Sequence, residues 1–511
     1  MSIHGKNFIG NELSAKGDKS SKIYDINSGD ALNGDFYHAT SDEVSTALSL
    51  ANSAFLVYKQ KTQNQRADFL DAIAEEIMNL GDELVVRTMA ESNLPRPRIE
   101  GERGRTVGQL KMFATLLRDG SWVEASIDTA LPDRQPLPRN DLRKMLRPLG
   151  VVSVFEASNF PLAFSCAGGD TASALAAGCP VVMKAHAAHP ATAELVARAI
   201  LKAIESCDLD PGVFSLIQGK NYAISTQIVT HPLVKAVGFT GSERVGMILQ
   251  QQIHQRAEPI PFYGELGSIN PQFIMPNKVN ENGAEIAQGL VASLMMGQGQ
   301  FCTSPGVWVV IGDGKSENYQ TFITSASEAL TEQRAGVMLT PAMCAGYNAA
   351  VEERKTLSGV TLLATGQAGN EQECSASLFA TDLATFAKSP LLQEEVFGFS
   401  ALVVRCADVA EMMQFVSLLK GNLTASIHGL DSDLAVSKEL SLTLAHKVGR
   451  LIYNQMPTGV EVCASMNHGG PFPASTNIRT TSVGSEAIIR FRRPICYQNM
   501  PAELLPSLLR D

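Results

Sequence analysis

The fold is decided by the stretch Val151-Val152-Ser153-Val154-Phe155, which is followed by an alanine-rich segment at residues 171–177 and then by Val181-Val182-Met183-Lys184. The two apolar runs predict strands, and the segment between them predicts a helix. The alternation continues with two strands and two helices, at residues 212–217, 234–239, 191–206 and 223–229. Short apolar strands alternating with helices indicate a parallel sheet buried on both faces, whose ligands bind at the carboxyl ends of the strands.

Three further regions flank this sheet. Residues 41–120 are predicted to be helical, because apolar residues recur there at three- and four-residue spacings, as within residues 69–80. A second alternating region at residues 290–451 predicts another α/β domain, with strands at 307–311, 401–404 and 449–453. Residues 131–149 are proline-rich and then basic, which predicts an arm that leaves the compact body.

The composition limits the class of protein. A chain of 511 residues exceeds what one core organises, so two or three domains are expected. The 45% hydrophobic and 18% charged content is that of a globular enzyme, and a net charge of -10 argues against nucleic acid as a partner. No apolar run is long enough to span a membrane. Nine dispersed cysteines with no zinc-ligand spacing predict no metal site and favour a reducing compartment, so we expect a cytoplasmic protein without a membrane partner.

A cysteine and a glutamate lie on glycine-flanked turns. Cys302 ends the run Gly297-Gln298-Gly299-Gln300-Phe301-Cys302, and Glu265 lies in Gly264-Glu265-Leu266-Gly267. A thiolate on such a turn can attack a carbonyl carbon, and a nearby carboxylate can then activate water. Taken alone, Cys302 is more often a buried core cysteine, and the glutamate motif is more often an ordinary turn.

A helix start supplies a weak nucleotide signal. The run Phe239-Thr240-Gly241-Ser242 follows a predicted strand and opens a helix that contains Gly246. Backbone N–H groups at such a helix start can bind a pyrophosphate. The same pattern also arises when a serine N-cap is followed by a packing glycine, and the G-x-G-x-x-G fingerprint is absent.

Five motifs occur in order along the chain: Ala157-Ser158-Asn159-Phe160-Pro161, Phe239-Thr240-Gly241-Ser242, Gly264-Glu265-Leu266-Gly267, Gly299-Gln300-Phe301-Cys302 and Glu394-Glu395-Val396-Phe397-Gly398. In this register the chain resembles the aldehyde dehydrogenase superfamily. The extended motifs Gly-Glu-Leu-Gly-Ser-Ile-Asn-Pro and His468-Gly469-Gly470-Pro471 are similar to the branch of α-ketoglutaric semialdehyde (2,5-dioxovalerate) dehydrogenases and NADP-dependent fatty aldehyde dehydrogenases.

The resemblance implies an α/β architecture with three parts. A Rossmann-type parallel-sheet cofactor domain would comprise residues 1–130 and 150–267, and an α/β catalytic domain residues 268–479. A β oligomerisation arm would comprise residues 131–149 and 480–511. In the family such arms add strands across a subunit interface, so a homodimer or a dimer of dimers is expected.

The resemblance also implies roles for individual residues. Cys302 would attack an aldehyde carbon, Glu265 would activate the hydrolytic water, and the Asn159 side-chain amide with the Cys302 backbone N–H would stabilise the oxyanion. Cofactor contacts are expected at Lys184, Gly241, Ser242, Gly246, Glu395 and Phe397. Phe160 and His468 are expected near the substrate, where His468 could move a proton or be a structural loop histidine.

The cofactor is expected to be NADP, with NAD possible. NAD-preferring relatives often carry a glutamate that binds the ribose 2′-hydroxyl three residues after the lysine that matches Lys184, and this chain has Ala187 there. Without that carboxylate, Lys184 and Lys220 could attract a 2′-phosphate.

The resemblance implies NAD(P)-dependent oxidation of an aldehyde to a carboxylate, with α-ketoglutarate semialdehyde as the expected substrate and a medium- or long-chain fatty aldehyde as the alternative; the residues alone do not choose between them. An α-ketoglutarate semialdehyde calls for cations that hold its carboxylate, and no arginine can be placed near the thiol from sequence. A fatty aldehyde calls for an apolar tunnel, which Phe160, Leu162, Phe164 and Phe472 would suit.

Two other classes of protein are less consistent with the sequence than a dehydrogenase. An inactive, binding relative is disfavoured because Cys302, Glu265 and Asn159 are all present. A cofactor-free thiol hydrolase is disfavoured because no histidine pairing is recognisable for Cys302. Phe399, where the family commonly has proline, raises a question about the local loop, and Ile269 replaces a common lysine.

Overall fold

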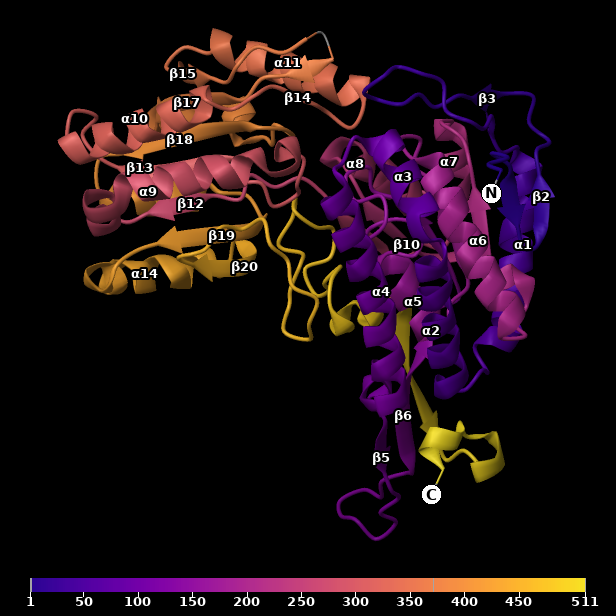
Figure 1. Ribbon diagram of the computed structural model, residues 1–511. Coiled ribbons are helices and arrows are strands. Elements are labelled where there is room, and N and C mark those ends of the chain that lie inside the picture. Colours follow the sequence, from indigo (N-terminus) through magenta and orange to yellow (C-terminus); the bar gives the residue numbers. More distant parts are fainter. Residues whose placement is uncertain (1, 371, 511) are drawn as a thin grey trace.

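The computed structural model describes residues 2–370 and 372–510 and consists of two α/β units and a projecting arm (Figure 1). The first unit contains a seven-stranded sheet in the order β11-β10-β7-β8-β9-β1-β2. Its parallel strands are β7 (Val151–Phe155), β8 (Val181–Lys184), β9 (Phe214–Ile217), β10 (Val234–Thr240) and β11 (Phe262–Glu265). The antiparallel strands β1 (Asn7–Ile9) and β2 (Glu12–Ser14) complete one edge. The predicted parallel sheet is confirmed.

Helices cover both faces of this sheet, because successive strand side chains point to opposite faces. One face packs against α1 (Ser41–Tyr58), α7 (Tyr222–Thr230) and α8 (Glu243–His254). The other packs against α5 (Gly169–Ala177) and α6 (Pro190–Ser206), with α2 (Gln63–Asn79), α3 (Gly81–Ser92) and α4 (Arg96–Asp119) outside them. Capping boxes begin α1 at Thr40 and α2 at Thr62. The helical prediction for residues 41–120 is confirmed.

The second unit has its own seven-stranded sheet, in the order β15-β17-β18-β13-β12-β19-β20, of which only β15 pairs antiparallel among the described strands. Its strands are β12 (Gln272–Ile274), β13 (Val307–Ile311), β15 (Thr361–Thr365), β17 (Ser377–Asp382), β18 (Ser400–Cys406), β19 (Asn422–His428) and β20 (Val448–Tyr453). Its helices are α9 (Pro276–Met295), α10 (Glu317–Thr331), α11 (Pro341–Thr356), α12 (Leu383–Lys388), α13 (Val409–Leu418) and α14 (Leu434–Leu444).

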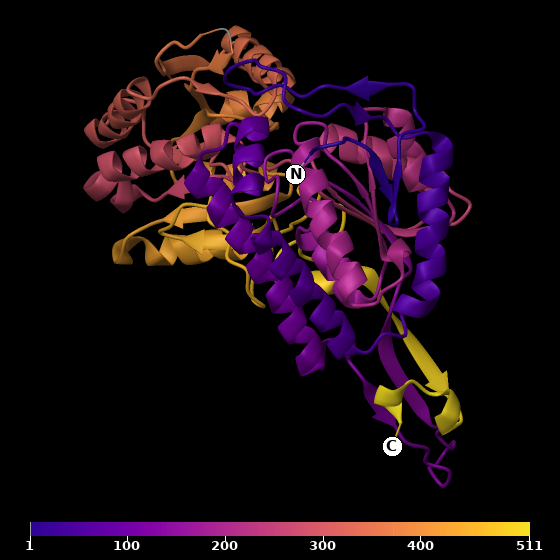
Figure 2. The ribbon, with the colours of Figure 1, turned by 45° about the vertical axis from the view of Figure 1, so that its right-hand side comes forward.

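The arm is a three-stranded antiparallel sheet that projects from the first unit (Figures 1 and 2). It consists of β5 (Ser126–Asp128), β6 (Leu142–Pro148) and β21 (Arg492–Gln498), with β6 in the middle. The strand β5 lies before the range predicted for the arm. The prediction started at the proline-rich segment, and no sequence pattern marked β5 as part of the same sheet.

Other local details differ from the sequence reading. The strand expected at residues 212–217 is shorter, because residues Pro211–Val213 form a 3-10 turn capped by Asp210. Phe399 is fully buried and packs on Tyr347 with ring centroids 5.3 Å apart, so it fills the core of the second unit. Cys344 and Cys374 form a disulfide between α11 and the strand β16 (Glu373–Cys374), which their dispersed spacing did not predict.

Candidate active site

The thiol is carried by a tightly held loop between the two units. Gly297, Gln298 and Gly299 have φ angles of 55°, 54° and 65°. A Cβ at Gly299 would lie 2.3 Å from the carbonyl carbon of Gly398, so only glycine fits there. Asn270 Nδ2 donates to the carbonyl oxygens of Cys302 at 2.8 Å and Ser304 at 2.9 Å. The backbone around the thiol is therefore held in position before any ligand binds.

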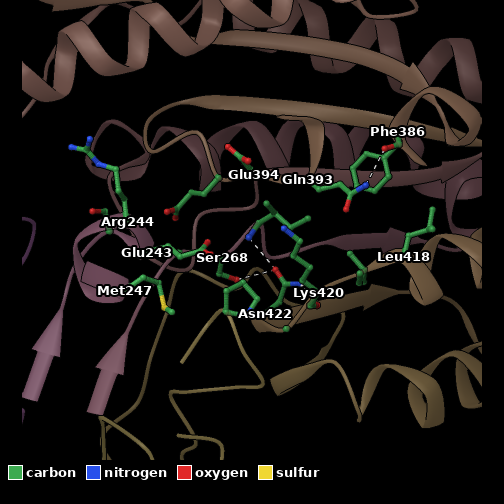
Figure 3. Close-up of a pocket in the computed structure, with 17 residues that line it drawn as sticks. Glu243, Arg244, Met247, Ser268, Phe386, Gln393, Glu394, Leu418, Lys420 and Asn422 are labelled. Atoms are coloured by element: carbon green, nitrogen blue, oxygen red, sulfur yellow. Dashed lines mark hydrogen bonds between the residues drawn. The ribbon is translucent and has the colours of Figure 1, made fainter. Parts of the chain in front are cut away.

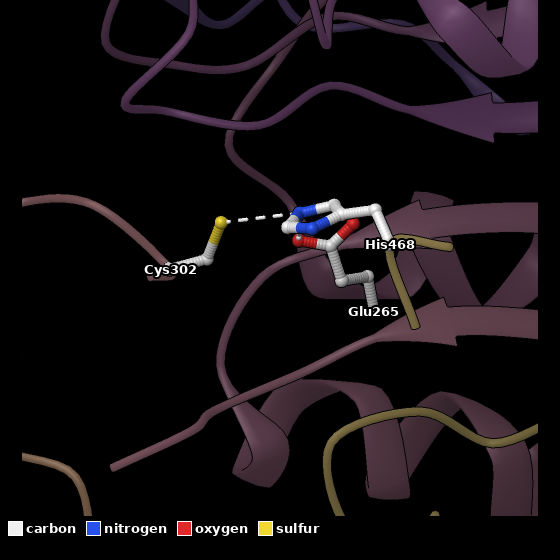
Figure 4. A group of neighbouring side chains, drawn as sticks. All are labelled: Glu265, Cys302 and His468. Atoms are coloured by element: carbon white, nitrogen blue, oxygen red, sulfur yellow. Dashed lines mark hydrogen bonds and ion pairs between the residues drawn. The ribbon is translucent and has the colours of Figure 1, made fainter. Parts of the chain in front are cut away.

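Cys302, His468 and Glu265 form one cluster (Figure 4). Cys302 Sγ lies 3.3 Å from His468 Nε2, and the same nitrogen lies 2.9 Å from Glu265 Oε1. Ser482 Oγ donates to Glu265 Oε2 at 2.6 Å. This corrects the sequence reading that Cys302 has no histidine partner: His468 is 166 residues away, and no local pattern joins the two. The three ligand atoms lie within 4.8 Å of one another, so the cluster could also hold a metal ion, which the sequence did not predict.

The segment of residues 468–482 runs alongside β11 and so brings His468 and Ser482 to Glu265. Glu265 ends β11, and Ser475 forms an isolated bridge with it. Leu266 N donates to Ala474 O at 2.9 Å. The segment from His468 to Ser482 is closed by a hydrogen bond from Ser482 N to His468 O at 2.9 Å. A histidine and a serine late in the chain are thereby brought against the carboxylate.

The electrostatics keep the thiol protonated and the carboxylate ionised. Burial, and next the charge of Glu265, raise the pKa of Cys302 well above its ordinary range. Burial also acts to raise the pKa of Glu265, but His468 and the hydroxyl of Ser482 outweigh it, so the pKa is lowered. A buried carboxylate beside a protonated thiol can take up the thiol proton.

Asn159 lies where β7 ends, beside the thiol loop. Its Nδ2 donates to Gln300 O at 2.9 Å and the residue is buried. The next turn is held by Glu102 of α4, which accepts hydrogen bonds from Leu162 N at 2.8 Å and Ala163 N at 3.0 Å. One N–H of the Asn159 amide is thus used by the loop, and the amide group carries a second.

A cavity of about 520 Å³ connects most of the predicted site. The predicted residues that line it are Asn159, Phe160, Gly241, Ser242, Glu265, Cys302, Glu395 and Phe397. Burial raises the pKa of Glu395 to about 8, and a Cβ at Gly267 would lie 2.8 Å from Glu395 Oε2. Catalytic and cofactor candidates from both units therefore face a common space.

A second cavity of about 400 Å³ adjoins the first and shares Ser242, Arg244 and Glu395 with it (Figure 3). Ser242 is the N-cap of α8, and its Oγ accepts from Val245 N at 3.4 Å. The positive end of a 12-residue helix thus opens onto both cavities, where phosphate groups are favoured. These residues fit a dinucleotide lying across the carboxyl end of the sheet.

Two predicted cofactor residues lie outside these cavities. Gly246 is buried in α8 against Leu266, whose Cδ2 would lie 2.4 Å from an added Cβ, so it acts as a packing glycine. Lys184 Nζ donates to the carbonyl oxygens of Ala185 at 2.8 Å and Gly219 at 2.6 Å, and burial lowers its pKa to about 8.

The aromatic residues predicted for an apolar tunnel separate into two groups. Phe160 packs on Phe164 and on Phe301, with ring centroids 5.2 and 5.4 Å apart. Phe164 lies 6.1 Å from His468. Leu162 is buried in the first unit's core, and Phe472 is 52% exposed. Of the four predicted apolar residues, Phe160 and Phe164 line the cavity that contains Cys302, and Phe301 packs on Phe160.

Sequence reasoning missed several supporting residues. Asn270 follows the quoted glutamate motif and has a φ of 44°, which is common for asparagine and gives a recognisable signal only once the motif is aligned with a turn. Ser482 and Glu102 carry no such signal, because a lone serine and a helix carboxylate are ordinary surface residues in sequence.

Residues 16–486 match the profile described as the aldehyde dehydrogenase family. The chain is 46% identical over 514 residues to α-ketoglutaric semialdehyde dehydrogenase 2 of Azospirillum brasilense, covering 100% of this chain and 97% of that protein. It is 47% identical to the α-ketoglutaric semialdehyde dehydrogenase of Acinetobacter baylyi, over 93% of this chain and 90% of that protein.

Solved structures share the fold at lower identity. NADP-dependent glyceraldehyde-3-phosphate dehydrogenase from Bacillus halodurans, complexed with NADP, has a TM-score of 0.80 and 19% identity, covering 97% of this chain and 99% of that one. A 1-pyrroline-5-carboxylate dehydrogenase has a TM-score of 0.82 and 19% identity, covering 97% of this chain and 93% of that one.

Proposed function

The chain belongs to the aldehyde dehydrogenase family, and from this premise we propose that it oxidises α-ketoglutarate semialdehyde to α-ketoglutarate with NADP as cofactor. Enzymes of this family use NAD or NADP. The observation that carries the proposal is the cluster of Cys302, His468 and Glu265, which supplies a nucleophile and a base in contact. The near full-length relatives that act on this semialdehyde support the choice of substrate.

In the proposed reaction Cys302 attacks the aldehyde carbon, and the thiol proton passes toward Glu265 or His468. The oxyanion forms beside the Asn159 amide and the Cys302 backbone N–H. The bound cofactor supplies the acceptor for the hydride that leaves this tetrahedral adduct. Glu265 then draws a proton from water, which hydrolyses the thioester on Cys302 and releases the carboxylate. His468 holds the carboxylate in place for both proton transfers.

We propose that the pyrophosphate and nicotinamide parts of the dinucleotide lie along the two cavities, and that its adenosine end extends toward Lys184 and the cavity that Ala187 and Lys220 line. Gly241, Ser242 and the N-terminus of α8 would bind the pyrophosphate, while Glu395 and Phe397 would bind the nicotinamide ribose. Lys184 would contact the adenosine ribose, and Gly246 would let α8 pack closely.

NADP is favoured over NAD by the residues at the ribose end. Ala187, Lys220 and Lys22 line a cavity of about 880 Å³ that shares Thr340 and Ala342 with the catalytic cavity. Two exposed lysines there would attract a 2′-phosphate, and Ala187 offers no carboxylate to repel it; of the two carboxylates that also line this cavity, Asp25 opposes the lysines, whereas Glu91 is paired with Arg87.

A medium- or long-chain aldehyde is the second candidate substrate. The rings of Phe160, Phe164 and Phe301 favour it, because they offer an apolar wall beside the thiol. An inactive relative is disfavoured because thiol, base and oxyanion donor face a common cavity.

We propose that residues 1–130 and 150–267 bind the cofactor, that residues 268–479 carry the catalytic thiol, and that the arm of residues 131–149 and 480–511 joins subunits into a dimer or a dimer of dimers. The outer arm strand β5 is exposed along its length, which suits pairing with a second copy. No described helix combines the length and apolar character needed to cross a membrane. From the dispersed cysteines of the sequence we propose a cytoplasmic enzyme.

The proposal is tested by following NADPH and NADH formation with α-ketoglutarate semialdehyde, succinate semialdehyde and a series of aliphatic aldehydes. We expect the highest kcat/KM with α-ketoglutarate semialdehyde and NADP. A kcat/KM that rises steadily with aliphatic chain length would favour the fatty aldehyde function instead. Absence of turnover with every aldehyde would favour an inactive relative.

A further inference from the structure

Two arginines approach the thiol from elements that the motifs do not include. Arg105 lies on α4, seven residues or about two turns after Arg98, and so on the same helix face. Arg98 marks where that face points: its guanidinium lies 4.4 Å from the Phe160 ring and 4.6 Å from the Phe301 ring, and Nη2 donates to Asn159 O at 3.4 Å. Arg105 therefore lies on the face of α4 that borders the thiol loop.

Arg450 reaches the same place from β20. Its neighbour Gly449 accepts a hydrogen bond from Asn467 Nδ2 at 2.9 Å, and a Cβ at Gly449 would lie 2.0 Å from Gly469 O. Asn467 and Gly469, which flank His468, therefore both contact Gly449, the residue before Arg450. Because His468 contacts Cys302, this arginine lies close behind the catalytic cluster.

One loop connects the two arginines. Arg105 Nη1 donates to Val460 O, while Arg450 Nη1 and Nη2 donate to Gly459 O and Pro457 O. A guanidinium has five N–H groups, so both retain donors after these bonds. Arg450 Nε is buried and has no hydrogen-bond partner among the described residues. Both guanidinium groups therefore keep unused N–H donors, and at least one of these, Arg450 Nε, is shielded from water.

The charges at this place are incompletely balanced by protein carboxylates. Arg98 pairs with Glu102, its Nε lying 3.3 Å from Oε2. Arg105 interacts with Glu102 at a distance and with the exposed Glu461. For Arg450 we find no carboxylate partner in the described part of the chain. Burial lowers the pKa of Arg105 and Arg450, and the negative charge of a Cys302 thiolate acts in the opposite direction on both. Both guanidinium groups are thus within electrostatic reach of the thiol.

We propose that Arg105 and Arg450 form a carboxylate-binding subsite that holds the far end of the substrate while Cys302 attacks its aldehyde. Arginine binds carboxylates in a fixed planar geometry, and the aromatic wall of Phe160 and Phe301 would lie along the intervening methylene groups. This rests on the proposed function and names its substrate class: short ω-oxo acids rather than neutral aldehydes of equal length. The competing interpretation is that the arginines only fasten the loop at residues 457–460.

The first experiment compares kcat/KM for α-ketoglutarate semialdehyde with kcat/KM for pentanal, which has the same carbon number but no carboxylate. In Arg105→Met and Arg450→Met we expect the ratio of the two values to fall roughly 10- to 100-fold, as for loss of a hydrogen bond to a charged group. Arg103→Met is the matched control. Arg103 lies on the same helix, but its side chain points away from the thiol and donates to Gly81 O, at an N···O distance of 2.8 Å. We expect it to keep the wild-type ratio. Equal losses with both substrates would mean that the arginines only fasten the loop, and would overturn the proposal.

The second experiment does not need turnover and separates this subsite from the proposed function. Iodoacetate and iodoacetamide both alkylate cysteine, but only iodoacetate carries a negative charge. The experiment measures the rate at which each reagent alkylates Cys302. We expect the iodoacetate-to-iodoacetamide ratio to fall about tenfold in Arg105→Met and Arg450→Met but not in Arg103→Met. An unchanged ratio would overturn the subsite even if the semialdehyde is the substrate. A reduced ratio in an enzyme without preference for the semialdehyde would keep the anion subsite and reject only the proposed substrate.

Discussion

His468 Nε2 lies 2.9 Å from Glu265 Oε1 and uses this same nitrogen to approach Cys302 Sγ at 3.3 Å. A neutral imidazole carries one N–H, so this nitrogen either donates to the carboxylate or accepts from the thiol. The thiol and the carboxylate therefore share one partner. The protonation of the cluster decides whether Cys302 is a nucleophile, which makes its pH dependence the first property to measure.

The alkylation rate of Cys302 should keep rising above pH 9 in the enzyme without cofactor. Burial and the charge of Glu265 raise the pKa of the thiol above its ordinary range, so the reactive thiolate is scarce at neutral pH. Glu265→Gln removes that charge and should shift the profile to lower pH. Iodoacetamide labelling followed by mass spectrometry gives the rates. A wild-type plateau below pH 8 would contradict this assignment.

Glu265→Gln should separate acylation from hydrolysis. The amide keeps the shape of the side chain and can still accept from Ser482, but it cannot take a proton from water. We expect a burst of NADPH close to one per active site, followed by a steady rate about 10²- to 10⁴-fold below that of the wild type. Rapid-quench or stopped-flow absorbance measures both phases. Loss of the burst together with the steady rate would assign Glu265 to thiol activation instead.

Asn159→Ala should lower kcat/KM by roughly 10²- to 10³-fold, the usual cost of one lost oxyanion donor. The Asn159 amide also donates to Gln300 O, so the variant could loosen the thiol loop. Asn159→Asp preserves the size of the side chain but places a negative charge where the oxyanion develops. An aspartate variant with near wild-type kcat/KM would mean that the residue acts only on the loop.

The sequence predicted those parts of the structure that depend on local pattern. The alternation around Val151–Phe155 was sufficient for the parallel sheet, because strand and helix periods are written in consecutive residues. The thiol loop was recognisable from its glycines, which the left-handed angles at Gly297 and Gly299 require. Contacts between distant segments were not recognisable. No sequence pattern near Cys302 indicates that His468 contacts it.

The charged surroundings of the thiol illustrate the same limit. Arg105 lies in a helix and Arg450 in a strand, and in sequence each is one of many basic residues. Only the path of the loop between them brings both guanidinium groups toward one place. The buried environment of Lys184 was likewise invisible, because a strand-end lysine is normally exposed.

On the proposed binding of NADP, Ala187→Glu should lower the preference for NADP relative to NAD. The new carboxylate would face the cavity that Lys220 and Lys22 line, and it would repel a 2′-phosphate while accepting from a 2′-hydroxyl. We expect the NADP-to-NAD ratio of kcat/KM to fall roughly tenfold or more, as for one unfavourable close charge pair. Lys220→Met should reduce the ratio by removing attraction, with little change in the values for NAD. Unchanged NADP-to-NAD ratios in both variants would mean that the 2′-phosphate does not bind in this cavity.

Glu156→Gln should stabilise the protein increasingly as the pH rises from 5 to 8. Glu156 follows β7 in the buried floor of the first unit, where burial raises its pKa to about 8 and its Oε2 accepts from His186 N at 2.7 Å. His189 Nδ1 lies 3.8 Å away, but burial lowers the pKa of His189 to about 4, so it is neutral and supplies no charge.

The sign of this effect follows from where the proton is held more tightly. The folded protein binds the Glu156 proton more tightly than the unfolded chain does, so the stabilisation is complete below the unfolded pKa and is lost as pH rises through the folded pKa of about 8. The glutamine variant has no such loss. Removing Glu156 also removes its attraction to Lys184, which costs the variant stability only where both groups are charged. The pKa of Glu156 stays raised despite this attraction, so the upward trend with pH remains.

The measurement is the difference in Tm between Glu156→Gln and the wild type across this pH range, repeated in about 0.5 M salt because buried charges are screened far less than surface charges. We expect the difference to grow with pH and to persist in salt. A difference that shrinks with rising pH would mean that Glu156 is ionised and stabilised by Lys184 in the folded protein, and the core of the first unit would then contain a buried ion pair.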